Sequence, residues 1–384
     1  MREVVIAGVG MHPFGRFPDK DYRDLGREAA LMALKDANVP WKDIQAGYVG
    51  NVMAEMTKGH QILQYFGQTG IPIVNIECAC ASGGVGLWQA KSAIENGQYD
   101  LAIVVGVEKA PKGFIANTGF DRWQMYTGLG ATPEYFAMWA QQTMQEEGLT
   151  LDDLAYISVK NHRNGALNPY AMYQKACTAE EVLNSPIVCP PLNLLMLCAP
   201  NEGAAAMVIG AKDVVKKYTS RYVSIASVAF VTKTVDEDLF PEPSIPIPEY
   251  TDACIKKTLS ARVSSLAYEL AGIGPEDLSL IEMQDTDVGN ELRDLVRLGL
   301  VKRGEVAKAL ADGDLEPGGR IPTNVSGGLL SKGEPLGASA MGQLVELTWQ
   351  LRGDAGPRQI KGAKVGAGHT SGAAGNSVFV ILKK

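Results

Sequence analysis

Short apolar runs alternate with longer amphipathic stretches along the first hundred residues, and they predict strands and helices in turn. The run over 100–107 is apolar at nearly every position, which is typical of a strand buried on both faces. The order βαβαβ predicts a mostly parallel sheet covered by helices. The predicted elements are a strand over 4–9, a helix over 22–38, strands over 46–52 and 71–76, a helix over 81–96 and a strand over 100–107.

The second half of the chain repeats this pattern. Aligning Ser82-Gly83-Gly84 with Ser326-Gly327-Gly328 pairs Cys80 with Asn324. We therefore expect two copies of one α/β unit, an N-terminal half over 1–212 and a C-terminal half over 213–384, whose matched helix N-termini meet at their interface. The predicted elements of the second copy are strands over 222–230, 278–283 and within 364–380, and helices over 251–271 and 335–351.

A long segment at about 110–199 interrupts the first half and is rich in methionine and aromatic residues. Insertions of this length within a compact domain are usually functional, so one interpretation is a helical cap over a substrate. The alternative is an ordinary helical insertion with a small core of its own. A second segment, the proline-rich 240–248, is expected to be an extended surface loop.

Composition narrows the possible functions. The net charge of −7 over 384 residues argues against nucleic-acid binding. The six cysteines form no CxxC pair, so we expect no metal site in this chain, and free thiols suit a reducing cytoplasm. No apolar run is long enough to span a membrane, and residues 1–6 resemble a first strand and not a signal peptide. Gly8-Val9-Gly10 lacks the third glycine of a dinucleotide fingerprint, since Pro13 stands there.

Cys80 is the strongest candidate for chemistry. It lies where the predicted strand over 71–76 gives way to the predicted helix over 81–96, and the positive end of a helix dipole favours a thiolate there. Ser82 can cap the turn, and the glycines that follow it allow a thioester to approach closely. These features predict a nucleophile that accepts an acyl group. Taken alone, a cysteine such as Cys80 is more often an inert buried thiol than a nucleophile.

Several segments outside the turn at Cys80 share a small-residue, glycine-rich character. They are Asn201-Glu202-Gly203-Ala204-Ala205-Ala206, Asn324-Val325-Ser326-Gly327-Gly328-Leu329-Leu330-Ser331-Lys332-Gly333 and the C-terminal 366–372. With Cys80-Ala81-Ser82-Gly83 and the duplication, they resemble the thiolase superfamily, in particular its sterol-carrier-protein-X or lipid-transfer-protein type. The resemblance covers essentially the whole chain. It implies an α/β fold of two pseudo-twofold-related βαβαβ halves, with mixed sheets in layers and a helical cap in the first half.

The resemblance also implies a reaction. A cysteine attacks the 3-keto carbon of a 3-oxoacyl-CoA, an acyl-CoA enolate leaves, and coenzyme A, the cosubstrate, removes the acyl group. Cys80 matches this nucleophile. The family usually carries His-Asp where this chain has Gln284-Asp285, and Gly-His-Pro where it has Gly333-Glu334-Pro335. Both customary histidines are therefore absent.

Five other positions complete the predicted site. His369 falls on the family's C-terminal catalytic loop and is expected to be the base for Cys80 and for coenzyme A. Glu334 is expected to act as an acid or base, or to orient the substrate, because burial can raise a carboxyl pKa. Gln284 keeps an amide donor for an oxyanion. Asn324 and the backbone of Gly372 are expected to support the same oxyanion site.

The leading functional interpretation is a thiolase that cleaves a bulky, branched or aromatic 3-oxoacyl-CoA, with benzoylsuccinyl-CoA-type thiolases as one candidate subgroup. A thiolase-fold retro-aldolase and a Claisen-condensing acyltransferase are enzyme alternatives. A catalytically silent scaffold or lipid-binding or acyl-CoA-binding subunit is an alternative of another class. The resemblance implies a homodimer and a small zinc-ribbon/OB-fold acyl-CoA-binding partner. It implies no nucleic-acid or membrane partner.

Overall fold

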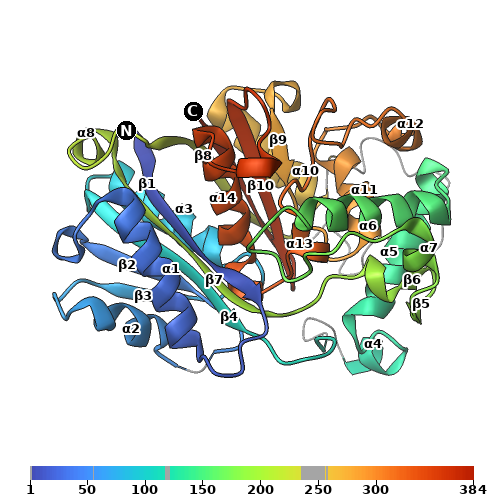
Figure 1. Cartoon of the computed structure of the whole chain (residues 1–384), viewed down its shortest axis with the longest axis horizontal. Helices are drawn as coiled ribbons and strands as arrows, with labels where there is room; N and C mark the ends of the chain where they lie inside the picture. Colours follow the sequence, from blue (N-terminus) through green and yellow to red (C-terminus); the bar gives the residue numbers. More distant parts are fainter. Residues whose placement is uncertain (1, 55, 117–121, 235–255, 257) are drawn as a thin grey trace.

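The computed structural model of the chain describes residues 2–54, 56–116, 122–234, 256 and 258–384. Nine strands form one large sheet, and helices cover both of its faces (Figure 1). The strands of this sheet are β1 (Val4–Gly15), β2 (Ala46–Gly50), β3 (Ile73–Ile76), β4 (Leu101–Lys109), β7 (Glu202–Ala211), β8 (Val223–Thr232), β9 (Leu280–Glu282), β10 (Val365–Gly372) and β11 (Asn376–Lys383).

The sheet is mixed, and the expectation of a mostly parallel sheet was wrong. Among the described residues, five of its strand pairings are antiparallel and three are parallel. Strand β7 accounts for much of the difference, because it lies antiparallel between β1 and β4. Every residue of β7 is buried, and the sequence analysis recognised its first residues only as a motif.

The strand order shows the duplication directly. From the middle outward, β1, β7, β4 and β2 in the first half mirror β8, β11, β10 and β9 in the second. Strand β3 extends the first half by one edge strand. The halves join through a short antiparallel contact, in which Val5 and Ile6 of β1 oppose Ser224 and Val223 of β8.

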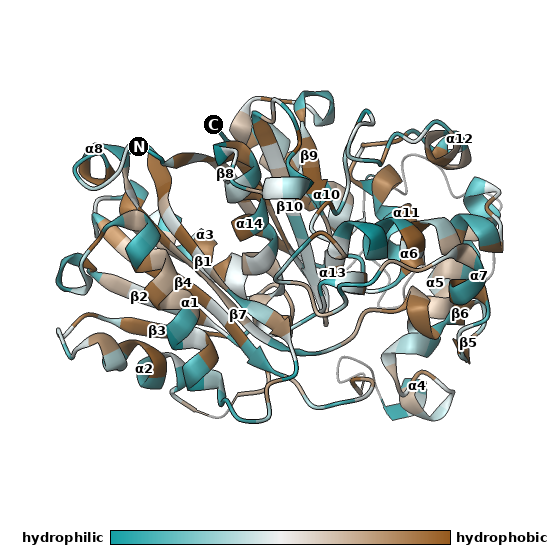
Figure 2. Cartoon of the chain, viewed as in Figure 1, coloured by the Kyte–Doolittle hydropathy of each residue, from teal (hydrophilic) through white to brown (hydrophobic). Residues whose placement is uncertain are grey.

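Two buried helices occupy the centre of the molecule. Helix α3 (Ser82–Glu95) leads into β4, and helix α14 (Leu336–Arg352) leads into β10. They pack against each other and on strands of both halves, within one hydrophobic core. Hydrophobic residues follow the first-half strands and α14 in Figure 2. The remaining helices of four or more residues are α1 (Tyr22–Ala37), α2 (Lys58–Leu63), α4 (Arg122–Tyr126), α5 (Thr132–Glu147), α6 (Leu151–Gly165), α7 (Ala179–Leu183), α8 (Lys212–Val215), α10 (Leu259–Ala271), α11 (Val288–Arg297), α12 (Val306–Ala311) and α13 (Gly328–Ser331).

The glycines of β1 serve helix packing. A Cβ at Gly8 would lie 2.2 Å from the backbone nitrogen of Ala37, and a Cβ at Gly10 would lie 2.3 Å from the carbonyl oxygen of Ala29. Helix α1 therefore sits directly on the strand at these two positions. This packing explains the Gly8-Val9-Gly10 pattern without a nucleotide.

The inserted segment at about 110–199 shares a core with the second half. Helices α5 and α6 and the small hairpin of β5 (Ile187–Cys189) and β6 (Leu192–Asn193) belong to it. Residues such as Ala140 and Ile157 pack in one buried cluster with Leu292 and Phe379. Figure 1 shows α5 and α6 beside α11, away from the first-half strands. The insertion therefore has no separate core of its own. The proline-rich 240–248 lies outside the described residues.

We predict that Gly106→Ala lowers the thermal unfolding temperature. The added Cβ would lie 2.5 Å from the carbonyl oxygen of Gly337 and 2.8 Å from Cα of Ala338, so β4 and α14 must move apart. Overpacking of this kind costs about 1–3 kcal/mol. Gly318→Ala is the matched control, since nothing lies within 4 Å of its added Cβ. Equal melting temperatures for the two variants would contradict this account of the packing.

Candidate functional site

Cys80 lies in a tight turn between β3 and α3. Ala79 has a positive φ of 48°, a conformation that costs free energy for any residue except glycine. The hydroxyl of Ser82 fixes the turn: it accepts a hydrogen bond from the backbone N–H of Cys78 at 2.8 Å and donates one to the carbonyl of Ala79 at 2.6 Å. Ser82 thus braces the turn from inside the helix, and Cys80 remains partly exposed.

Glu334 is the counterpart of Cys80 in the second half. Cys80 stands two residues before the first residue of α3, and Glu334 stands two residues before the first residue of α14. Since α3 and α14 lead into the mirrored strands β4 and β10, the two positions correspond. The sequence pairing of Cys80 with Asn324 was wrong, because Ser326-Gly327-Gly328 opens the four-residue helix α13 and not α14.

The carboxylate of Glu334 accepts hydrogen bonds from two side chains. The thiol of Cys198 lies 2.9 Å from Oε2, and the amide nitrogen of Gln284 lies 3.0 Å from Oε1. The thiol of Cys80 lies beside the same carboxylate, whose charge raises the pKa of that thiol. Glu334 and Gln284 are 3% and 2% exposed, whereas both cysteines are partly exposed.

The sequence analysis gave Cys198 no role. It reaches the site because its backbone N–H donates to the carbonyl of Thr286 at 2.9 Å. On the other side, Glu334 N–H donates to Ala199 O at 3.1 Å, and Asn201 N–H donates to Glu334 O at 3.2 Å. The segment holding Cys198 is therefore bonded to the chain on both sides. Its position just before the Asn201–Ala206 motif was the one available signal.

Burial and like charge keep protons on both sulfurs. Burial, followed by the charge of Glu334, raises the pKa of Cys80 and of Cys198 well above the usual value for a thiol. Glu108 raises the pKa of Cys80 further. Burial also raises the pKa of Glu334, and hydrogen bonding to the carboxylate opposes that shift. At Cys80 these effects outweigh the helix dipole, so the expected thiolate is a thiol in this state.

A buried polar network holds the loops that carry Gln284 and Glu334. Lys160 and Glu291, both fully buried, form an ion pair at 2.8 Å. Asn161 donates both to Glu291 at 2.7 Å and to Asp285 at 2.9 Å. Asp285 in turn accepts from the backbone N–H groups of Leu329 and Leu330 at the start of α13. The network thus ties the residue after Gln284 to the chain that leads to Glu334.

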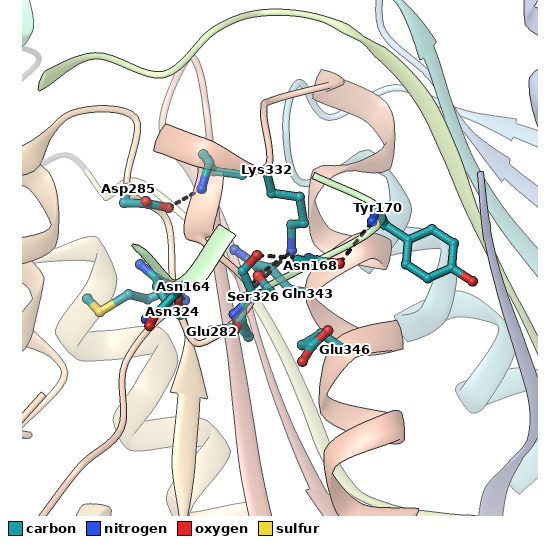
Figure 3. Close-up of polar contacts among 12 residues, drawn as sticks. Asn164, Asn168, Tyr170, Glu282, Asp285, Asn324, Ser326, Lys332, Gln343 and Glu346 are labelled. Carbon is teal, nitrogen blue, oxygen red and sulfur yellow. Dashed lines mark hydrogen bonds and ion pairs between the residues drawn. The ribbon is translucent and has the colours of Figure 1, made fainter. Parts of the chain in front are cut away.

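Asn324 belongs to this network. Its amide oxygen accepts from Met283 N–H at 2.8 Å, and its amide nitrogen donates to Glu291 at 2.8 Å. Both ends of the amide are therefore used within the protein. Figure 3 shows Asn324 together with the neighbouring cluster in which Lys332 donates to Ser326 at 2.8 Å and faces Glu282.

The structure places His369 in a different polar cluster. Its ring lies 3.6 Å from Asp294 through Nδ1, and 3.1 and 3.3 Å from the hydroxyls of Ser377 and Ser371 through Nε2. Burial lowers its pKa, so the ring is neutral at neutral pH. In the described part of the chain, no hydrogen bond or ion pair joins His369 to Cys80 or Glu334.

Gly372, at the end of β10, lies against the turn of the nucleophile. A Cβ at this position would lie 2.4 Å from the carbonyl oxygen of Cys78. The structure therefore brings together Cys80, Glu334, Gln284 and the backbone of Gly372. It places Asn324 behind them, in the supporting network.

Comparison with known families decides the identity of the fold. The thiolase N-terminal domain matches residues 4–213, and the thiolase C-terminal domain-like family matches residues 249–384. The chain belongs to the thiolase family. The family assignment and the thiolase fold suggested by the sequence are thereby confirmed, and the chain is a CoA-dependent acyltransferase by family.

Curated relatives match along nearly the whole thiolase chain. The acetyl-CoA acetyltransferase of Methanothermobacter thermautotrophicus is 36% identical over 100% of this chain and 99% of its own length. Sterol carrier protein 2 of Homo sapiens is 34% identical over 100% of this chain and 72% of its own length. The benzoylsuccinyl-CoA thiolase subunit BbsB of Thauera aromatica is 35% identical, over 94% and 92% of the two chains.

Solved structures share the thiolase fold. The Ltp2–ChsH2(DUF35) aldolase superposes with a TM-score of 0.85 at 24% identity, covering 99% of this chain and 97% of that chain. Human mitochondrial 3-ketoacyl-CoA thiolase in complex with CoA superposes with a TM-score of 0.73 at 18% identity, covering 100% and 98%. Within the described part of this thiolase, no helix combines the length and the apolar character needed to cross a membrane.

We predict that Glu291→Gln destabilises this thiolase strongly. The substitution removes the buried carboxylate that neutralises Lys160, and breaking a buried pair on one side costs roughly 3–5 kcal/mol. The double variant Lys160→Met with Glu291→Gln removes the unpaired charge and is expected to recover much of the loss. Thermal unfolding monitored by circular dichroism measures both. If Glu291→Gln alone were as stable as the parent chain, breaking the Lys160–Glu291 ion pair would not have the predicted cost in stability.

Proposed function

We propose that this thiolase cleaves a 3-oxoacyl-CoA with coenzyme A through an acyl-cysteine intermediate on Cys80. The observation that carries the proposal is the buried carboxylate of Glu334, which lies beside the thiol of Cys80 at the matching position ahead of α14. A thiol whose pKa is raised needs a base in contact with it before it can attack a carbonyl carbon. Glu334 is that base, and burial raises its own pKa toward the range useful for proton transfer.

The first half-reaction follows from this contact. Glu334 takes the proton of Cys80 as the sulfur attacks the 3-keto carbon, and the carbon–carbon bond then breaks to leave an acyl group on Cys80. The oxyanions that develop need hydrogen-bond donors. Gln284 has a second amide N–H beyond the one given to Glu334, and the backbone at Gly372 lies beside the nucleophile turn. We assign oxyanion support to these two groups and a positioning role to Asn324.

His369 has no step in this scheme. Its side chain faces Asp294 and Ser377, where it can orient β10 and β11 against α11. The base role suggested for it from sequence passes to Glu334. The loss of the histidine usual at position 334 is then a replacement of one proton acceptor by another.

Bulky or aromatic 3-oxoacyl-CoA substrates fit the proposal best. The relative BbsB, which is 35% identical, is a subunit of benzoylsuccinyl-CoA thiolase. A cavity of about 290 Å³ is lined by Tyr22, Met53 and Val107 together with Glu108, whose charge also reaches Cys80. Its volume supports an acyl group larger than acetyl.

We further propose a cytoplasmic homodimer with a small acyl-CoA-binding partner. A reducing compartment keeps the thiols of the site free. The edge strand β3, with Val74 38% exposed, supports pairing between copies. The structural similarity to an aldolase solved with a DUF35 protein supports the small partner. Thiolysis measured with and without such a partner tests its requirement, and equal rates would remove it from the proposal.

We predict that Cys80→Ala abolishes acyl-enzyme formation. Incubation of the parent chain with acetyl-CoA should add one acetyl group to the peptide that contains Cys80, as detected by mass spectrometry. Cys177→Ala, at a partly exposed thiol elsewhere in the insertion, is the matched control and should acylate normally. Acylation of a different residue would overturn the proposal. A parent chain that turns over substrate without any acyl-cysteine would favour the retro-aldolase alternative.

We predict that Glu334→Gln slows acylation of Cys80, and that the acylation rate of this variant no longer falls at low pH. Loss of a positioned base costs roughly 10²- to 10⁴-fold in rate. In the parent chain the rate should fall as pH drops through the pKa of Glu334, which burial raises above 4.5, because the protonated carboxyl accepts no proton. Glu95→Gln, at the far end of α3, is the control. An unchanged acid limb in Glu334→Gln would assign the base to another residue.

A further inference from the structure

Cys198 is the second thiol on the carboxylate of Glu334. Its sulfur lies 2.9 Å from Oε2, and the thiol of Cys80 lies beside the same carboxylate. The two thiols come from different parts of the chain, the turn before α3 and the end of the insertion. The two thiols also affect each other: a negative charge on Cys80 would raise the pKa of Cys198.

We propose that Cys198 is a catalytic acid and base in the reaction of Cys80, donating a proton to the departing enolate carbon and later removing one from the incoming thiol. This inference rests on the proposed function and extends it to a residue without an assigned role. The contact that carries it is the Sγ–Oε2 hydrogen bond, because it places a second exchangeable proton within the reacting cluster.

The protons balance with Cys198 in this role. In the first half-reaction Glu334 takes the proton of Cys80 and is neutral when the carbon–carbon bond breaks. The enolate carbon takes the proton of Cys198, which leaves a thiolate. In the second half-reaction that thiolate takes the proton of coenzyme A, whose sulfur attacks the acyl group. Cys80 leaves as a thiolate and recovers its proton from Glu334, so all three groups return to their starting states.

The other side chains on Glu334 cannot fill this role. Cys80 carries the acyl group at that stage, and the amide of Gln284 donates hydrogen bonds without transferring protons. Cys198 is the remaining hydrogen-bond partner of the carboxylate. Its raised pKa keeps it protonated, as a proton donor must be before the enolate forms.

Two unpaired buried acceptors point to a ligand: Gln284 belongs to this cluster, and Asn201 lies against Gly333, the residue before Glu334. The amide oxygens of Gln284 and Asn201 have no hydrogen-bond partner among the described residues, and the two residues are 2% and 0% exposed. An unpaired buried acceptor costs about 1–3 kcal/mol, so such groups are expected to be paired when the site is occupied. The pantetheine arm of a thioester carries amide N–H donors, which would suit acceptors at this position.

The test separates acylation from proton transfer to carbon. Acetyl-CoA in D₂O is the probe: acetyl on Cys80 is followed by mass spectrometry, and deuterium in the methyl group of acetyl-CoA is followed by NMR. In Cys198→Ala we expect acylation within about tenfold of the parent chain, because coenzyme A can leave as a thiolate. Deuterium exchange should fall roughly 10²- to 10⁴-fold, as for loss of a general acid–base group.

Cys198→Ser keeps the size of the side chain but is a much weaker acid, so it should lose exchange as well while retaining the parent melting temperature. Cys189→Ala, at a partly exposed thiol in β5, is the matched control and should leave both readouts unchanged. Normal exchange in both Cys198 variants would overturn the inference, as would a parent chain that acylates Cys80 without exchange. A parent chain that forms no acyl-Cys80 would instead overturn the proposed function.

Discussion

The site depends on how closely the N-terminal ends of α3 and α14 approach each other. A Cβ at Gly83 would lie 2.6 Å from the side chain of Met341 and 3.0 Å from the carbonyl oxygen of Gly337. Only residues without a side chain allow two buried helices to meet in this way. Because Cys80 and Glu334 hold the same place ahead of their helices, the same approach brings sulfur and carboxylate together.

Burial then sets the chemical state of this pair. A carboxylate and two thiols in a shielded cluster all resist ionisation, since charge is costly away from water. One negative charge on Glu334, stabilised by hydrogen bonds from Cys198 and Gln284, satisfies the cluster. The sulfurs consequently stay protonated until a substrate carbonyl is attacked and its oxygen accepts the negative charge. A lysine or arginine beside Cys80 would have produced a free thiolate instead, with less need for a neighbouring base.

The local pattern of apolar and polar residues was enough to predict the elements of the first half. The positions of family motifs were enough to predict Cys80, Gln284 and Glu334 as site residues. Pattern failed where tertiary contacts decide. Ser326-Gly327-Gly328 looks like the start of a long helix but opens one turn, because Asp285 caps it and the chain then bends toward Glu334. Cys198 is 136 residues from Glu334 in sequence, and no local period connects them. Strand β7, buried along its whole length, lacked the alternation that marks a half-exposed strand.

The shared core of the insertion and the second half has a consequence for biosynthesis. Helices α5 and α6 are made early, yet their apolar residues bury against α11 and β11, which leave the ribosome more than a hundred residues later. The N-terminal half therefore cannot complete its packing during its own synthesis, and it waits with exposed apolar surface for the C-terminal half. Cys198 reaches the carboxylate only at that last stage. A truncated or stalled chain would thus carry the nucleophile without the group that activates it.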